Sequence, residues 1–340
     1  MTVVDQLPND IFQVIFSFID ERQNYLPVML VCKKWIVPKE RPLALRAKWN
    51  KFACNYLNFS IDNQCAIKWA SFSGHLQVVE RLLKDSKVDP SVDYQYAIRW
   101  AAFSGHLQVV ERLLKDSRGR AEPCGPKAVD PSADNQYTIR WAAENGHYLM
   151  VASLLKDSRG RALPCGPKAV DPSTDNQWAI RRASQNGHHL VVEILLKDTR
   201  VDPSACNQWA IRWASQNGHD LVVKILLKDT RGRALPCGPK AVDPSANNQE
   251  AIIWAARNGH HLVIEALLND PRVYPSTVNQ CAIRCASRNG HHLVVGALLK
   301  DPRVDPSTDN QWAIGWASRN RHHLVVEALL KDPRVRNVVI

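Results

Sequence analysis

The chain has 340 residues, 45% of them hydrophobic and 23% charged, which is the composition of a folded protein with one to three domains. The longest apolar run, Ile11 to Ile19, is interrupted by Gln13 and Ser17 and is too short to span a bilayer. Acidic residues, with no Lys or Arg, precede this run, which reverses the charge order of a secretory signal. We therefore expect no membrane contact.

Charge and cysteine content limit the partners and the compartment. The net charge of +11 favours an acidic partner or a weak contact with nucleic acid. The nine cysteines are an odd number at scattered positions, which does not fit a disulfide framework. We interpret them as reduced thiols and expect a cytoplasmic or nuclear protein, in a host cell if the source is viral.

The first distinct segment runs from Gln6 to Trp35. It has a Leu-Pro start, an Ile-Phe-x-Phe core and a Val-Cys-Lys-x-Trp end, and its apolar residues fall on helical faces. This pattern resembles an F-box, and the resemblance implies a Skp1-like subunit of a cullin ubiquitin ligase as partner. On the same resemblance, the residues expected to carry that contact are Leu7, Pro8, Ile11, Ile15, Phe16, Val31 and Trp35. The alternative is that the segment is only an N-terminal cap that shields the first repeat.

A helix within residues 43–61 is expected to join this segment to the rest of the chain and to cover the first repeat. We therefore assign residues 1–50 to an F-box-like helical domain, 51–61 to a connecting helix and 62–336 to a repeat array.

The array consists of eight similar units with a basic period of 31 residues. Three of the intervals are 41 residues long, because ten-residue inserts rich in Gly and Pro (119–128, 160–169 and 232–241) extend the connecting loops. The units begin at Asp62, Asp93, Asp134, Asp175, Cys206, Asn247, Val278 and Asp309.

Each unit predicts two short helices, as its fifth copy illustrates. The first covers Asn-Gln-Trp-Ala-Ile-Arg-Trp-Ala-Ser and ends at Gly218, because glycine adopts the left-handed conformation that terminates helices. The second carries an apolar stripe of Leu221, Val222, Ile225 and Leu226, and it ends before a Val-Asp-Pro-Ser turn at 242–245. Helix pairs this short cannot bury their apolar faces alone, so neighbouring units must stack.

The Gly-His between the helices, the Val-Val-x-x-Leu-Leu second helix and the Val-Asp-Pro turn resemble the ankyrin repeat, from about Asp62 to Val335. The resemblance implies an all-α solenoid that binds other proteins. The unit is two residues shorter than usual, and Trp-Ala-Ile-Arg (209–212) replaces the Thr-Pro-Leu-His of the family, so the hydrogen bonds of that motif must be absent or replaced. Shortened arrays of this kind look like those of amoebae and their large DNA viruses.

Three rows of side chains recur along the array. All twelve histidines fall in the turn between the helices, where the ankyrin resemblance implies that they cap the second helix and bridge repeats rather than bind metal. We expect the tryptophans of the first helix to pack between repeats. The basic row beside them (Lys68, Arg99, Arg140, Arg181, Arg212 and Arg284) leaves a nucleic-acid surface as an alternative, although a net charge of about one per repeat is sparse for that function.

The residue that ends the first helix varies in an ordered way from aromatic through acidic and amide to basic. In ankyrin-like arrays this position faces the concave groove that binds partners, so we predict a target-binding groove formed by Phe72, Phe103, Glu144, Gln185, Gln216, Arg257, Arg288 and Arg319. The arginines favour acidic groups on the partner at that end.

No residue pattern indicates catalysis. The chain has no Gly-rich phosphate loop and no Gly-x-Ser-x-Gly motif, and every His is explained by the repeat. Cys281 and Cys285 replace aromatic residues of the sister units and are interpreted as packing residues. We therefore predict a monomeric adaptor for protein–protein interaction, with no catalytic residues, no metal and no cofactor.

Overall fold

The computed structural model describes residues 65–116, 129–157, 169–229 and 241–336. The chain divides into two compact units, Met1–Leu57 and Asn58–Ile340, and all described residues belong to the second. The F-box-like segment, the connecting helix, Asp62 and nearly all of the three inserts therefore lie outside the described residues.

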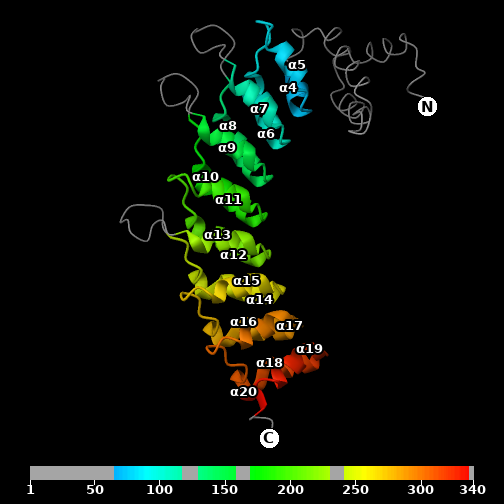
Figure 1. Cartoon of the computed structure of the whole chain (residues 1–340), viewed down its shortest axis with the longest axis vertical. Helices are drawn as coiled ribbons and strands as arrows, with labels where there is room; N and C mark the ends of the chain where they lie inside the picture. Colours follow the sequence, from blue (N-terminus) through cyan, green and yellow to red (C-terminus); the bar gives the residue numbers. More distant parts are fainter. Residues whose placement is uncertain (1–64, 117–128, 158–168, 230–240, 337–340) are drawn as a thin grey trace, which may run out of the picture. The chain divides into compact units, whose positions relative to one another are not determined.

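The described residues form an all-α fold of eight helix pairs followed by one short helix (Figure 1). The first helices of the pairs are α4 (Cys65–Phe72), α6 (Val92–Phe103), α8 (Ala133–Glu144), α10 (Thr174–Gln185), α12 (Ala205–Gln216), α14 (Ala246–Asn258), α16 (Thr277–Arg288) and α18 (Thr308–Arg319). The second helices are α5 (Leu76–Leu82), α7 (Leu107–Leu114), α9 (Tyr148–Lys156), α11 (His189–Leu195), α13 (Asp220–Lys228), α15 (His261–Leu268), α17 (His292–Leu299) and α19 (His323–Leu330). The sequence did not predict α20 (Pro333–Arg336), which follows the last pair. No described helix combines the length and apolar character needed to cross a membrane.

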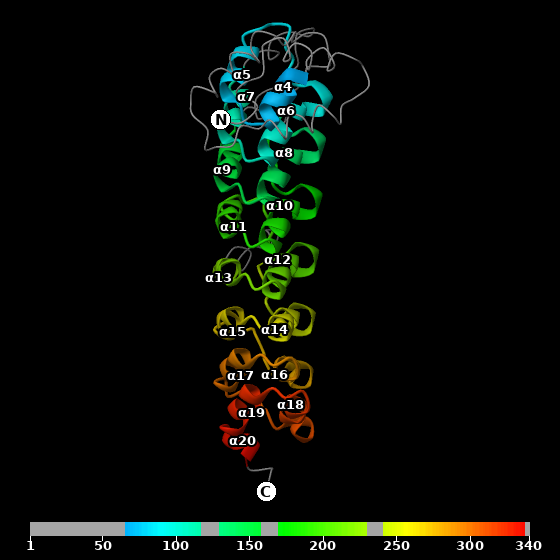
Figure 2. The same ribbon diagram turned by 90° about the vertical axis from the view of Figure 1, so that its right-hand side faces the viewer.

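The helices stack in two columns, one of first helices and one of second helices, as Figure 2 shows. Each first helix contacts the first helices before and after it, and each second helix does the same in its own column. The core lies between the columns. In the fifth repeat, Ile211 and Ala214 of α12 are fully buried, because the small alanine lets neighbouring helices approach closely.

The apolar stripe of the second helix is narrower than predicted. Val222, Val223 and Leu226 are buried, whereas Leu221 is 50% exposed and Ile225 is only half-buried. The prediction that Leu221 and Ile225 belong to the core stripe was therefore wrong. The buried residues are spaced i, i+1 and i+4, so they lie on one side of the helix, and this side packs against the neighbouring helices.

The first helix begins with a left-handed turn that the sequence did not predict. In α12 this turn comprises Cys206, Asn207 and Gln208, with φ between 52° and 60°, and right-handed helix follows from Trp209. Six other first helices, α6 to α18, have the same three-residue turn. Asp and Asn tolerate this conformation better than most residues, but three in succession are unusual. The repeat boundaries predicted from Asp93 onwards coincide with the first residue of these turns.

The third residue of the turn holds the two ends of the repeat together. Gln208 is buried, its Nε2 donates to the carbonyl of Ala241 at 3.3 Å, and its Oε1 accepts from the backbone N–H of Asp243 at 3.0 Å. The equivalent amides of Gln136, Gln177, Gln249 and Gln311 donate to the matching loop carbonyls. These bonds connect the start of the first helix to the loop that follows the second helix.

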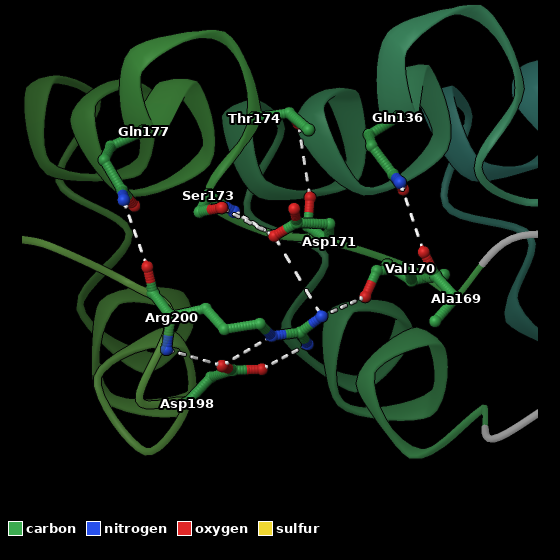
Figure 3. Close-up of polar contacts among 9 residues, drawn as sticks. All are labelled: Gln136, Ala169, Val170, Asp171, Ser173, Thr174, Gln177, Asp198 and Arg200. Atoms are coloured by element: carbon green, nitrogen blue, oxygen red, sulfur yellow. Dashed lines mark hydrogen bonds and ion pairs between the residues drawn. The ribbon is translucent and has the colours of Figure 1, made fainter. Parts of the chain in front are cut away.

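The Val-Asp-Pro-Ser turn is stabilised by its own aspartate (Figure 3). Asp171 Oδ1 accepts from the backbone N–H of Ser173 at 2.9 Å and from its hydroxyl at 2.7 Å. Arg200 of the next turn forms a two-pronged bond with Asp198 and also donates to the carbonyl of Val170 in the preceding repeat at 2.9 Å. Together with the glutamine bonds, these contacts connect the loops of successive repeats in a chain that lacks the Thr-Pro-Leu-His motif.

The first helix ends at a glycine in the left-handed conformation, as predicted. Gly187 has a φ of 80°, and a Cβ at this position would lie only 2.6 Å from Nδ1 of His219 in the next repeat. The equivalent residue of the eighth repeat is Arg321, with a φ of 61°. No further histidine ring stacks on Arg321 among the described residues, so a side chain fits there.

Candidate partner-binding face

The candidate face is formed by the ends of the first helices. We define the ladder row as the eight residues predicted to form the groove, each at or next to the last position of its helix: Phe72, Phe103, Glu144, Gln185, Gln216, Arg257, Arg288 and Arg319. The structure places them at equivalent positions of successive repeats. The first five are half-buried and the three arginines are exposed.

The backbone of the ladder row is fixed by the following repeat. Nε2 of His219 lies 2.9 Å from the carbonyl oxygen of Gln185, and Nδ2 of Asn217 donates to the same oxygen at 2.9 Å. Because a carbonyl only accepts, Nε2 must carry the proton. Six further histidines make the same bond at 2.9–3.1 Å: His106, His147, His188, His260, His291 and His322.

These bonds confirm that histidine bridges the repeats, but they correct the expected cap. His219 occupies the N-cap position of α13, yet its side chain makes no capping hydrogen bond. The ring instead turns toward the preceding repeat. Among the described residues, no group of three or more His, Cys, Asp or Glu side chains is placed to hold a metal ion.

The bridging histidines make stability depend on pH. Burial lowers the pKa of His188 and of His260 below the ordinary value, against the opposing effect of the backbone bond, and the neighbouring histidines lower both values slightly further. As the pH falls, these two histidines therefore bind protons at a higher pH in the unfolded chain than in the folded chain. Their contribution to stability is fully present above the unfolded pKa of about 6.5 and is lost as the pH falls through the folded pKa.

We therefore expect the urea midpoint of unfolding to be lower at mildly acidic pH than at pH 8, and His188→Asn combined with His260→Asn to reduce this difference. His189→Asn is the matched control, since the second histidine of the turn takes no part in the bridge. An unchanged pH dependence in the double variant would contradict the assignment.

The side chains of the ladder row contact the aromatic rings of the first helices. Phe103 lies edge-on to Trp141 of the next repeat, with ring centroids 5.3 Å apart, and Trp178 Nε1 donates to Glu144 Oε2 at 3.2 Å. Arg257 lies over Trp254, and Trp316 is contacted by Arg288 and Arg319 at 5.0 and 5.3 Å from its ring centroid. The predicted packing of tryptophans between repeats is confirmed where the ring of one repeat meets the ladder residue of the preceding repeat.

The basic row is engaged in contacts between repeats. Arg140 Nη2 lies 2.8 Å from Asp175 Oδ2 of the next repeat, and its guanidinium stacks over Trp178 at 4.7 Å. Corresponding ion pairs join Lys68 to Asp93, Arg99 to Asp134, Arg212 to Glu250 and Arg284 to Asp309. Because these cations are already neutralised by neighbouring acids, they offer little to a phosphate backbone.

Arg181 is the exception, because the next repeat has Cys206 at the position where other repeats have the pairing aspartate. Cys206→Asp restores the pair found in the sister repeats, in a turn where Asp already adopts the same left-handed conformation. We expect it to raise the free energy of unfolding by about 0.5–1 kcal/mol in a urea titration. Asn247→Asp is the matched control and should gain less, because Arg212 is already paired with Glu250 at 2.6 Å. Equal gains from the two changes would contradict this account.

The two cysteines of α16 lie within the same face. Sγ of Cys281 and Sγ of Cys285 are 3.5 Å apart, and both side chains are partly buried where most of the sister repeats have aromatic rings. The hydrogen bond from Cys281, with help from the positive charges of Arg257, Arg284 and Arg288, lowers the pKa of Cys285 to about 6, although burial acts in the opposite direction. The interpretation of the two cysteines as packing residues only did not predict the three arginines around Cys285.

Sequence reasoning also missed a row of exposed leucines near the start of the second helices. Its members are Leu149, Leu190, Leu221, Leu262, Leu293 and Leu324, each 41–58% exposed. Their recurrence beside the histidines was visible in the sequence, but the predicted stripe assigned them to the core.

Stacked helix pairs tied together by repeated side-chain bonds define a helical repeat solenoid. The chain belongs to the ankyrin repeat family. The family model for ankyrin repeats in three copies matches residues 67–162, 98–204, 139–234, 180–277, 211–310 and 252–337. Proteins of this family are typically non-enzymatic scaffolds, and the repeats indicate that this chain serves protein–protein interaction. No curated protein matches the chain.

Proposed function

We propose that the chain is a recruiting adaptor, in which the ladder row binds a target protein and the F-box-like segment binds a Skp1-like subunit of a ubiquitin ligase. The observation that supports the first part is the ladder row itself. Its backbone is held rigidly by the next repeat, while its side chains change from aromatic to basic along the array. A rigid backbone that carries variable side chains is suited to selective binding, because little conformational entropy is lost on association.

The second part of the proposal is supported by the sequence pattern between Gln6 and Trp35 alone. Its residues Leu7, Pro8, Ile11, Ile15, Phe16, Val31 and Trp35 have the apolar spacing of a module that offers helical faces to a partner helix. An adaptor of this kind brings target and ligase together and performs no bond chemistry itself.

A pull-down with purified Skp1 tests the second part. We expect the full chain to retain Skp1, and Leu7→Asp combined with Pro8→Ala to lose it. Glu80→Gln, on the exposed side of α5, is the control that should retain it. If the unaltered chain does not bind Skp1, the ubiquitin role is refuted and the chain is a plain ankyrin scaffold.

A further inference from the structure

We propose that Arg257, Arg288 and Arg319 form a binding site for an extended acidic polypeptide segment with a carboxylate at every third residue. This inference rests on the proposed use of the ladder row for target binding and names the chemistry of the target. The three arginines lie on consecutive packed helices, α14, α16 and α18, at one guanidinium per repeat.

The three guanidinium groups are available to a ligand. All three residues are exposed, and none has a carboxylate of the described residues within 4.0 Å, the limit for an ion pair. Two acids of the same three helices are already paired with the basic row, Glu250 with Arg212 and Asp309 with Arg284. These arginines therefore differ from the basic row, in which every charge described above except that of Arg181 is paired with an acid.

The guanidinium groups are also oriented in advance. Arg257 lies over the ring of Trp254 at 4.9 Å, and Arg288 and Arg319 both lie over the ring of Trp316. Stacking restricts the long side chain but leaves the N–H groups at the edge of the guanidinium plane free to donate. An arginine held in this way binds a carboxylate in two-pronged geometry with a smaller entropy loss than a free side chain.

The spacing of the arginines selects the ligand. Packed helices lie about 8–10 Å apart, which sets the distance between the backbone positions of the three arginines. A polyproline II segment rises about 9 Å in each turn of three residues and so presents every third side chain on one face. Glutamates at every third position therefore meet successive arginines.

The contacts favour a polypeptide over single-stranded nucleic acid. Binding to single strands relies on bases stacking on free aromatic faces. Here the ring of Trp316 is already covered by two guanidinium groups. Toward the N-terminus the ladder row continues as Gln216 and Gln185, which offer no positive charge to a phosphate backbone, and Glu144, which would repel it.

The test measures binding of fluorescent nine-residue peptides to the full chain by anisotropy. The first peptide is three Glu-Pro-Pro units, and the second has the same composition with its three glutamates adjacent. We expect the spaced peptide to bind ~10-fold more tightly than the adjacent one. We expect the triple variant Arg257→Gln, Arg288→Gln and Arg319→Gln to weaken the spaced peptide by ~100-fold, and each single variant by ~3–10-fold.

Lys300→Gln is the charge-matched control, because this exposed residue at the end of α17 lies in the second-helix column and should leave binding unchanged. Equal affinity for the two peptides, or unchanged binding by a triple variant with the same urea midpoint, would overturn the inference. If the triple variant unfolds, the single variants decide in the same way. Tighter binding of a nine-nucleotide oligothymidylate than of the spaced peptide would also overturn it, in favour of nucleic acid.

Failure of this site is distinguishable from failure of the proposed function. If neither peptide binds, while a photo-crosslinker at Gln185 still captures a protein in cells, the ladder row binds a target of other chemistry. If the spaced peptide binds and no crosslink forms at Gln185, the arginine site for an acidic segment is supported, and the use of the whole ladder row for target binding is contradicted.

Discussion

Gly187→Ala is expected to lower the free energy of unfolding by about 2–5 kcal/mol, measured by urea denaturation. Alanine at a φ of 80° costs roughly 1–2 kcal/mol, and the added Cβ would lie 2.6 Å from the ring of His219, which adds about 1–3 kcal/mol for overpacking. The ring cannot move away without losing its bond to Gln185. The substitution therefore strains the turn and weakens the joint between two repeats at once.

Gly296→Ala is the matched control, because this glycine lies inside α17 and a Cβ there meets nothing within 4 Å. We expect it to stabilise the chain by about 0.5–1 kcal/mol, since alanine is the better helix former. If the two substitutions changed the free energy of unfolding in the same direction, the close approach of His219 to Gly187 would not contribute to the stability of the stacked repeats.

Gln208→Ala is expected to cost about 2–3 kcal/mol, because it removes the bonds to Ala241 and Asp243 and leaves partly buried backbone groups without partners. Gln208→Gly loses the same bonds but relieves the strain of a φ of 60°, so it should be less destabilising than alanine by about 1 kcal/mol. Urea titration of the two variants measures this difference.

Whether alanine or glycine is the more stable residue identifies the left-handed turn, because the preference reverses between two positions of the same helix. Two residues later, Ala210 lies in right-handed helix and is buried, so Ala210→Gly should cost about 1 kcal/mol or more. If Gln208→Gly were more destabilising than Gln208→Ala, the left-handed turn would be refuted.

The stack of helix pairs was predictable because it depends on features that recur in the sequence. The Gly-His between the helices and the Val-Asp-Pro-Ser turn are local signals, and the 31-residue period places them on equivalent faces. The left-handed turn was not predictable, because Asp-Asn-Gln is also acceptable at the start of an ordinary helix. The bonds that accompany the turn are tertiary, since Gln208 at its third position bonds to the loop that follows the second helix, and the local sequence does not reveal them.

The candidate face was predictable in position but not in its contacts. The ladder row was placed by its location before the glycine, and its change from Phe72 to Arg319 could be read directly from the sequence. The difference between the arginines of the basic row and those of the ladder row could not be read from the sequence. Arg140 is paired with Asp175, which lies 35 residues later, whereas Arg257 has no such partner. Sequence spacing alone does not show that the start of one repeat lies beside the middle of the preceding first helix.

The measurement that tests the central claim most directly is site-specific photo-crosslinking in eukaryotic cells that express the full chain. A photoreactive residue is placed either at Gln216, in the ladder row, or at Lys224, on the exposed side of α13 in the same repeat. The adaptor account predicts a discrete protein adduct from Gln216 that is absent from Lys224. Adducts from Lys224 alone, or the same adducts from both positions, would contradict the claim that the ladder row is the target-binding face.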